Sequence, residues 1–390
     1  MPWKETCPVN ERMMFVADYE RGELEMSALC RLYGISRKTG YKWLKRFFKE
    51  GPAGLEERSR APLRHPNETP EEIRKLLIRA RKAHRTWGPK KLLKWLSERH
   101  PNEAWPAVST AGEILKRHGL VTPKRRRQRV PPYDGRLPKS DRPNGVWTSD
   151  FKGQFRTRNR QMCYPLTVVD DYSRFLLDCH AQSGTSYKET KPQFERLFRE
   201  YGLPWVIQTD NGVPFASRAA AGLSRLSVWW LKLGIEPRRI APGHPEQNGR
   251  HERMHRTLKE EAVRPPRENL DEQQQAFDDF RRVFNRERPH EALGLETPES
   301  VYEPSDRLLP DRAPEPEYPG HYEVRRVRTN GEIKFRGERV FISESLIGEL
   351  VGLVEIDEGA WRVRFASLTL GLIDERTGSF KKPKLARKSK

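Results

Sequence analysis

The chain has 390 residues, more than one ordinary domain holds, and its 74 Lys and Arg outnumber its 54 Asp and Glu to give a net charge of +20. A membrane span, a signal peptide, a disulfide framework and a zinc knuckle are not expected, because no run of about 18 apolar residues, no apolar N-terminal stretch and no CxxC spacing occurs. We therefore expect a cytoplasmic, nucleoid-associated protein whose partner is a polyanion, most often nucleic acid, rather than a membrane.

The first expected elements are three helices in the order of a helix-turn-helix domain. Residues 11–22 and 26–34 form two short helices, and residues 36–51 form a third that begins at Ser36, a good N-cap. In this order the last helix is the one that enters the major groove of DNA.

The third helix is expected to have an apolar face of Tyr41, Leu44 and Phe48 and an opposite face that is basic. An ordinary three-helix bundle with a solvated basic face is the alternative. DNA binding is favoured because the basic residues lie on the helix that would read bases. The predicted DNA contacts in this helix are Arg37, Lys38, Lys42 and Lys45.

A second helical domain is expected over residues 66–122, with amphipathic helices at 68–84, 88–100 and 109–119. It is either a second helix-turn-helix or a support domain, and its charge pattern does not separate the two. The basic run 124–129 that follows would lie against phosphates.

The middle of the chain changes to a strand pattern at residue 146. Three strands are followed by a helix, a strand, a helix, a strand and further helices, which is the order of the ribonuclease-H-like α/β fold. The expected strands are 146–155, 163–173, 174–183, 204–212 and 235–243, and the expected helices are 187–202, 217–234, 247–263 and 270–290.

Three acidic residues of this region are candidate metal ligands: Asp150 in the first strand, Asp210 at the end of the fourth, and Glu252 on the helix after the fifth. Phosphoryl transfer with two Mg²⁺ needs such hard oxygen ligands, which hold the ions about 4 Å apart, and Mn²⁺ could replace Mg²⁺. Adjacent strands would place the two aspartates side by side, and the helix would bring in the glutamate. Asp170 and Asp171 are expected to cap a turn rather than to bind metal.

The histidines of this region match no metal-ligand spacing. His180, His251 and His290 are spread along the chain, and His290 is expected to close a helix end. Trp229 and Trp230 are expected in the core rather than on a base-stacking surface.

The C-terminal region is expected to be a small all-β barrel of the SH3-like kind, because residues 321–374 contain roughly five or six short strands. Asn330-Gly331 predicts a two-residue hairpin, and residues 357–359 predict a second turn.

These elements, with two Pro-rich segments that separate them, define the expected domain boundaries. The predicted domains are a helix-turn-helix domain at 1–60, a second helical domain at 66–122, a basic linker at 123–145, a ribonuclease-H-like core at 146–298, a Pro-rich linker at 299–319, a small β-barrel at 320–375 and a basic tail at 376–390.

Five stretches of the middle region resemble a known family. They are WTSDFKG, TVVDDYSRF, IQTDNGVPF, HPEQNGRHERMHRTLKEE and NRERPHEALG, and they cover most of residues 146–298. Through them the chain resembles a DDE transposase of the bacterial insertion-sequence type, in the superfamily of retroviral integrases. The combination of motifs is specific, whereas any one alone would be weak.

The resemblance also bears on the third carboxylate, for which Glu246 competes with Glu252. The family's usual spacing favours Glu246, with 35 residues between it and Asp210, whereas Glu252 leaves 41. The family's motif favours Glu252, because a His-Pro pair and an Asn-Gly pair precede it as in the motif. We choose Glu252, which would lie about one turn into a helix capped by Asn248.

One face of that helix would then carry a metal ligand and groups for phosphate, because residues three and four apart lie on the same side. This face is expected to hold Asn248, Glu252, His255, Arg256 and Lys259. Of these, Asn248, Arg256 and Lys259 are the predicted DNA contacts near the scissile bond.

The activity that the resemblance implies is DNA integration and recombination: binding of the ends of a mobile element, Mg²⁺-dependent 3′-end cleavage, and strand transfer into target DNA. The implied partners are double-stranded DNA and further copies of the chain, because two ends must be held together. A catalytically silent DNA-binding regulator and a ribonuclease-H-type nuclease are the alternatives. The complete acidic triad argues against the first, and the DNA-reading helices argue against the second.

Overall fold

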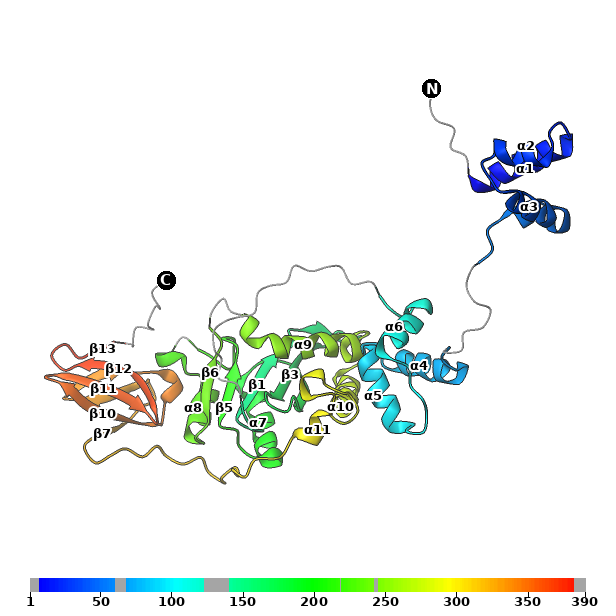
Figure 1. The fold of residues 1–390 in the computed structure, drawn as a ribbon. Coiled ribbons are helices and arrows are strands. Elements are labelled where there is room, and N and C mark those ends of the chain that lie inside the picture. The colour runs from blue at the N-terminus through cyan, green and yellow to red at the C-terminus, as the bar shows by residue number, and fades with distance from the viewer. Residues whose placement is uncertain (1–6, 60–67, 123–139, 218, 242–244, 382–390) are drawn as a thin grey trace. The chain divides into compact units, whose positions relative to one another are not determined.

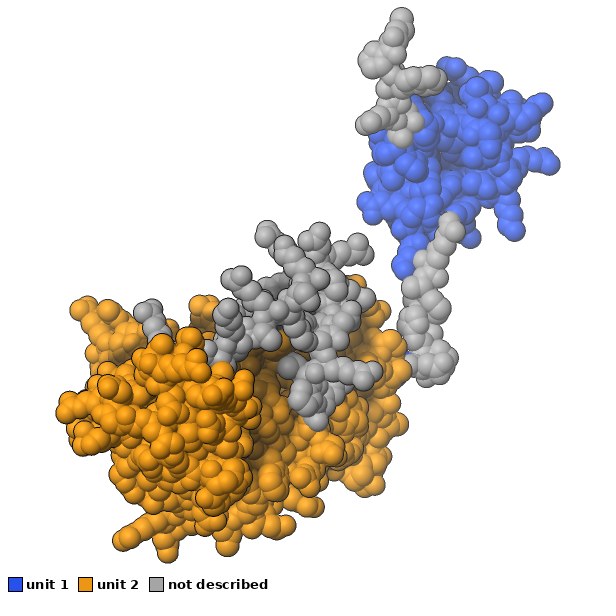
Figure 2. Space-filling model, turned by 90° about the vertical axis from the view of Figure 1, so that its left-hand side faces the viewer, with its two compact units in different colours: residues 1–68 blue, residues 69–390 orange. Residues whose placement is uncertain are grey.

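The computed structural model describes residues 7–59, 68–122, 140–217, 219–241 and 245–381 (Figure 1). The predicted basic patch at 124–129 lies outside these residues. The chain divides into two compact units, Met1–Glu68 and Thr69–Lys390, which Figure 2 colours separately. Within the described ranges, no helix has the length and apolar character needed to cross a membrane.

The first unit contains the predicted helix-turn-helix. Its helices are α1 (Pro8–Arg21), α2 (Met26–Leu32) and α3 (Arg37–Glu50), followed by the short 3-10 helix η1 (Gly51–Leu55). Ser36 is the N-cap of α3, as predicted, and its hydroxyl accepts a hydrogen bond from the Thr39 backbone N–H at 3.2 Å.

The predicted apolar face of α3 is right for Leu44 but wrong for Tyr41 and Phe48. Tyr41 and Phe48 are 56 % and 61 % exposed, whereas Gly40, Trp43 and Leu44 are buried. The helix is turned this way because Gly40 lets it approach the other two helices closely. A Cβ atom at position 40 would lie 2.8 Å from the Cys30 sulfur and 3.0 Å from the Phe15 ring.

The second unit begins with α4 (Glu71–Ala83), α5 (Pro89–Arg99) and α6 (Val108–Arg117), which share one hydrophobic cluster. Val283 packs against this cluster from a helix of the α/β core. The buried Arg288 guanidinium donates hydrogen bonds to Thr86 and Glu261, each at 3.1 Å. The second helical domain is therefore packed onto the α/β core, as a support domain would be.

The α/β core has the predicted order of elements, except that the strand predicted at 146–155 is divided in two and the helix predicted at 217–234 is limited to Arg225–Lys232. Its strands are β1 (Val146–Phe151), β2 (Phe155–Arg156), β3 (Met162–Asp170), β4 (Leu176–Gln182), β5 (Val206–Thr209) and β6 (Glu236–Arg239), and its helices are α7 (Tyr187–Tyr201), α8 (Arg225–Lys232), α9 (Gly249–Leu258) and α10 (Leu270–Arg286). Across the sheet the order is β4, β3, β1, β5 and β6, with β2 paired to the start of β3.

This sheet is mixed and is buried on both faces. Strand β3 is antiparallel to β1 and β4, whereas β5 is parallel to β1 and β6. Three antiparallel strands followed by two parallel ones form the ribonuclease-H-like arrangement. One face packs against α7 and α8, and the other packs against α9 and α10.

The C-terminal part of the second unit is all-β, as predicted. Its strands are β7 (Glu323–Arg326), β8 (Glu332–Phe335), β9 (Glu338–Phe341), β10 (Leu350–Asp357), β11 (Ala360–Phe365), β12 (Leu368–Asp374) and β13 (Ser379–Lys381). Five of them form a sheet in the order β13, β12, β11, β10 and β7, and β8 and β9 form a separate hairpin. The SH3-like barrel remains a prediction.

One of the two predicted turns joins paired strands and the other does not. Strands β10 and β11 are joined at residues 357–360, as predicted. Asn330-Gly331 lies in a turn closed by the Gly331 N–H to the Arg328 carbonyl, but β7 pairs with β10 rather than with β8. The hairpin turn is instead Arg336-Gly337, where both residues have positive φ, because such a turn matches the strand twist.

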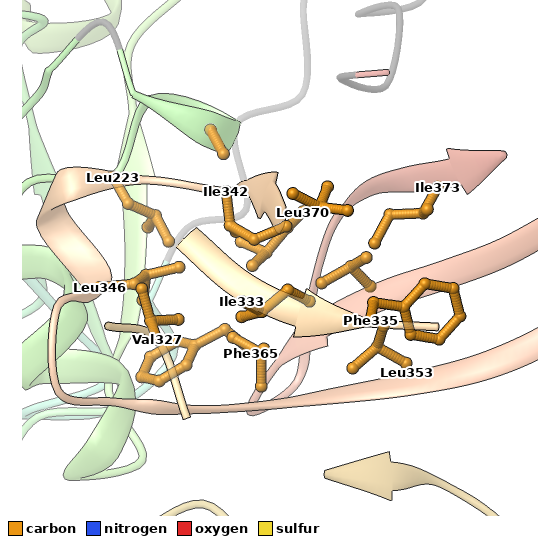
Figure 3. Packing of buried hydrophobic residues seen from close by; sticks show 14 of the residues in the cluster. Leu223, Val327, Ile333, Phe335, Ile342, Leu346, Leu353, Phe365, Leu370 and Ile373 are labelled. Atoms are coloured by element: carbon orange, nitrogen blue, oxygen red, sulfur yellow. The ribbon is translucent and has the colours of Figure 1, made fainter. Parts of the chain in front are cut away.

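The β part and the α/β core share one hydrophobic cluster. Ala220, Leu223 and Leu231 of the core are buried with residues of the strands (Figure 3). An ion pair of 2.9 Å between the Lys232 ammonium and the Glu349 carboxylate lies beside this cluster. The segment between Asp210 and α9, which makes the spacing to Glu252 longer than usual, thus provides part of the contact with the β part.

The segment 302–318, predicted to be a linker, packs along the core, and we call it the strap. The Tyr302 ring stacks on Phe175 with ring centroids 4.3 Å apart. The Arg307 guanidinium donates to the carbonyls of Pro204 at 2.6 Å and of Leu233 at 3.0 Å. A Pro-rich composition therefore does not make this segment a free tether.

The packing of α3 predicts unequal effects for two aromatic substitutions. Trp43→Ala should destabilise the first unit by about 3–5 kcal/mol, since a buried aromatic leaves a cavity. Phe48→Ala should change its stability by less than about 0.5 kcal/mol, since Phe48 is exposed. Hydrogen exchange of the α1–α3 amides in the full chain measures both, and equal losses of protection would contradict the observed face.

Candidate active site

Asp150 and Asp210 lie side by side at the middle of the sheet. Parallel pairing of β1 and β5 sets Ser149 opposite Thr209, so the next residue of each strand is an aspartate. The Asp150 side chain is 18 % exposed. The Asp210 carboxylate accepts a hydrogen bond of 3.0 Å from the Gly212 backbone N–H, which fixes the turn after β5.

Glu252 lies in the first turn of α9 and is exposed, and its charge reaches Asp150. Burial, together with the negative charges of Asp210 and, to a smaller extent, Glu252, raises the pKa of Asp150 to about 7. The Phe151 N–H and the Lys152 ammonium oppose this increase. The charges of Asp210 and Glu252 thus both act on Asp150, and that of Asp210 acts more strongly.

Asn248 has a different role from the predicted one. Its side chain makes no capping hydrogen bond to α9. Instead its amide nitrogen donates to the Asp150 carboxylate at 3.2 Å, across 98 residues of sequence. Asn248 therefore holds the carboxylate from the side of α9.

The backbone of Glu246 lies in a 3-10 turn, Pro245–Asn248, immediately before α9. Its side chain lies outside the described part of the chain. The choice between Glu246 and Glu252 therefore stays a prediction.

Two histidines of α9 have ring nitrogens close to the Asp150 carboxylate. His255, predicted to share the face of α9 that carries Glu252, is buried, and so is His251 one turn earlier, which was not predicted to lie at this site. Burial lowers the pKa of His251 to about 3 and that of His255 well below its ordinary value, so both rings are neutral. Their spacing of four residues on a helix next to a metal ligand was the signal that could have found them.

Basic side chains lie on α9, at its end and next to Asp150. Arg256 and Lys259 are exposed on α9 and at its end, as predicted. Lys152, which was not predicted, lies close enough to Lys259 and Asp150 for both to affect its pKa, which burial lowers first. These groups could neutralise DNA phosphates next to the acidic site.

The other acidic candidates serve the fold. The Asp170 carboxylate accepts hydrogen bonds from the backbone N–H groups of Asn144 and Ser173, each at 2.8 Å, and caps the turn as predicted. The Asp171 carboxylate forms a 2.7 Å ion pair with Arg250 and so ties that turn to the start of α9.

The remaining predictions for this region are also accounted for. The His290 ring hydrogen-bonds to the Phe284 backbone in the last turns of α10, as expected of a residue that closes a helix end. Trp230 is fully buried and Trp229 packs against the same core cluster.

The predicted DNA-contacting residues of α3 lie in the first unit and are exposed. The exposed side of the helix carries Arg37, Lys38, Tyr41, Lys42, Lys45 and Phe48. Both aromatic side chains, which were predicted to be buried, thus lie among the basic ones. Such a surface offers charges for phosphates and apolar groups for base edges.

Comparison with known families and proteins agrees with these features. Models of the integrase core domain match residues 140–245 and 233–298. A helix-turn-helix domain model matches residues 11–62, and a homeodomain-like domain model matches residues 39–115.

Similar proteins come from bacteria and from retroviruses. An uncharacterized protein of insertion element IS476 from Xanthomonas euvesicatoria is 26 % identical over 75 % of this chain and 76 % of its own length. A protein of insertion element IS407 from Burkholderia multivorans is 29 % identical over 47 % of this chain and 65 % of its own length. The Pol polyprotein of feline endogenous virus ECE1 is 33 % identical over 34 % of this chain, but over only 12 % of its own length.

Solved structures of similar proteins include the catalytic core domain of HTLV-2 integrase in complex with magnesium, with 18 % identity and a TM-score of 0.34 over 42 % of this chain and 99 % of that one. A simian T-cell lymphotropic virus intasome structure has 17 % identity and a TM-score of 0.38 over 75 % of this chain and 97 % of that one.

The raised pKa of Asp150 predicts how the stability of the metal-free protein depends on pH. The folded state binds the proton more tightly than the unfolded state, where the pKa is near 3.8, so this stabilisation is full below about pH 4 and is lost as the pH rises through 7. Its size is a few kcal/mol at most, at about 1.4 kcal/mol per pKa unit. Thermal melting in EDTA between pH 4 and 8 should show that the melting temperature falls more steeply with rising pH in wild type than in Asp150→Asn. Parallel plots of melting temperature against pH would contradict this prediction.

Proposed function

Because this chain belongs to the integrase-core family, together with proteins of bacterial insertion elements, we propose that it is a DNA transposase. It would bind the ends of a mobile element, cut them at the 3′ end and join them to target DNA. The observation that carries this proposal is that β1 and β5 bring Asp150 and Asp210 to neighbouring strand ends, and that the charges of Asp210 and Glu252 both act on Asp150.

The chemistry of this site fits divalent magnesium. Carboxylate oxygens are the ligands that Mg²⁺ prefers, and three negative charges placed together favour a cation between them. Asp150, Asp210 and Glu252 would hold two Mg²⁺, which Mn²⁺ could replace. When bound, the ions would stabilise charge on the attacking and leaving oxygens of the phosphodiester.

The chain's own residues would supply position and charge. The Asn248 amide orients the Asp150 carboxylate, and the basic side chains Lys152, Arg256 and Lys259 would hold phosphates of the DNA end. A water would first attack the phosphodiester and release a 3′-hydroxyl. That hydroxyl would then attack a target phosphodiester, so that one P–O bond forms as another breaks and no protein intermediate is needed.

The helices of the first unit would supply recognition of the element's ends through α3. Because two ends must be joined to one target, we propose that the active form is a homo-oligomer assembled on DNA. This arrangement rests on the helix-turn-helix and integrase-core matches.

The decisive experiment measures Mg²⁺-dependent cleavage and joining of the element's own ends by wild type, Glu252→Gln and Glu246→Gln. Glu252→Gln should lower the rate by at least about 10²-fold with DNA binding retained, since it removes a group that acts on the reacting phosphate. Glu246→Gln should keep activity. Glu260→Gln, an exposed glutamate just after α9, is the matched control.

Other results would change specific parts of the proposal. If only Glu246→Gln lost cleavage and joining activity, the third carboxylate would be Glu246, the residue with the family's usual spacing. An inactive wild type that still binds the ends would favour the silent regulator instead.

The basic surface of α3 predicts a salt-dependent contribution to DNA binding. Lys42→Ala together with Lys45→Ala should weaken binding to the element's ends and lower the slope of log K against log salt by about 2, because roughly 0.9 counterion is released per phosphate contact. Fluorescence anisotropy at several salt concentrations measures this slope. An unchanged slope, with hydrogen exchange showing an intact α3, would exclude these lysines from the interface.

A further inference from the structure

The interface between α9 and the sheet contains a small polar cluster within otherwise apolar packing. His251 and His255 point from α9 toward the sheet, where Thr148 of β1 and Thr167 of β3 meet them. All four side chains are buried. A buried polar cluster of this kind stabilises only one arrangement of its members, because each unpaired group would cost about 1–3 kcal/mol.

The Thr167 hydroxyl is the centre of this cluster. Its oxygen lies 2.9 Å from the Asp150 backbone carbonyl and 2.7 Å from a ring nitrogen, Nε2, of each histidine. A carbonyl can only accept, so the single hydroxyl hydrogen is donated to Asp150. Both histidines must then donate Nε2–H to the hydroxyl. The Thr148 hydroxyl lies 2.9 Å from His251 Nδ1 and 3.3 Å from the Val169 carbonyl, and its hydrogen is shared between these two acceptors because a neutral His251 carries its proton on Nε2.

These hydrogen bonds connect the two elements that carry the proposed metal ligands. Thr167 lies opposite Asp150 in the pairing of β3 with β1 and is bonded to its carbonyl. On α9, His251 is adjacent to Glu252, and His255 is one turn further on. One hydroxyl therefore links the backbone at Asp150 to the helix on both sides of Glu252.

We propose that His251 and His255, with Thr148 and Thr167, form a positioning clamp that sets the separation between the Asp150 and Glu252 carboxylates. The clamp rests on the proposed function in that these carboxylates are taken as metal ligands. The clamp fixes the distance of α9 from the sheet and the rotation of α9 about its own axis. The apolar contacts of Met254 and Leu258 alone would fix these less precisely.

A direct metal site at the histidines is the competing interpretation, because ligand atoms of Asp150, His251 and His255 lie within 4.8 Å of one another. Three of the four ring nitrogens, however, already contact threonine hydroxyls. The fourth, His255 Nδ1, lies 3.8 Å from the Asp150 carboxylate. The histidines thus have the contacts of groups that orient a ligand rather than those of ligands themselves.

The test measures Mn²⁺ binding to the full chain without DNA, by the electron paramagnetic resonance signal of the free ion. Thr167→Val removes the central hydroxyl but keeps the side-chain shape, and should weaken Mn²⁺ binding about 10- to 100-fold, as loss of an orienting partner does. Thr167→Ser restores the hydroxyl and should stay within about 3-fold of wild type. Thr190→Val, a buried threonine of α7, is the matched control and should bind normally. Asp150→Asn defines the signal that belongs to this site.

Each alternative result overturns the clamp in a recognisable way. Thr167→Val with wild-type affinity would remove the clamp and leave the proposed function intact. If Thr167→Ser or Thr190→Val lost as much Mn²⁺ affinity as Thr167→Val, the effect would come from packing and not from the hydroxyl. A wild type without Asp150-dependent binding would remove both the clamp and the proposed metal site. If Thr167→Val does not fold, Thr148→Val tests the His251 end, and unchanged affinity there would overturn the clamp.

Discussion

The burial of Asp150 near other negative charges is the constraint on which the rest of the proposed site depends. Asp150 is disfavoured as an anion by burial, and the charges of Asp210 and Glu252 add to this. A protein maintains such an arrangement only where its surroundings are rigid. The sheet has helices on both faces, and α9 presents a carboxylate to solvent while its other side is anchored by buried hydrogen bonds. The packing and the buried hydrogen bonds therefore hold Asp150 in place against the unfavourable charge of its surroundings.

Much of this core could be predicted because its determinants are local or periodic. Strand patterns and turn residues predicted the order of the elements, and in the ribonuclease-H-like fold that this order indicates, β1 and β5 are neighbours. Asp150 and Asp210 could therefore be paired before any contact was known. Ser36 was predicted as a cap for the same reason, since its partner Thr39 is three residues away.

The features that sequence did not predict depend on contacts between distant residues. Asn248 is a residue type that often caps helices, but the Asp150 carboxylate that it contacts is 98 residues away in the sequence. In α3 two stripes are similarly apolar, and only the close approach of Gly40 to residues of α1 and α2 selects the buried one. The strap is Pro-rich, yet Tyr302 and Arg307 find aromatic and carbonyl partners that its own sequence does not reveal.

The strap has a consequence for how firmly the β part must bind the core. A segment fastened by Tyr302 and Arg307 along the core, and again by the Tyr318 hydroxyl to the Leu350 carbonyl at 2.9 Å, leaves little free chain between them. The effective concentration of the β part at its docking surface is then high, on the millimolar scale expected for short tethers. The tether thereby adds to the contact around Leu223 in keeping the two together, and if that contact opens, the β part rebinds without diffusing away.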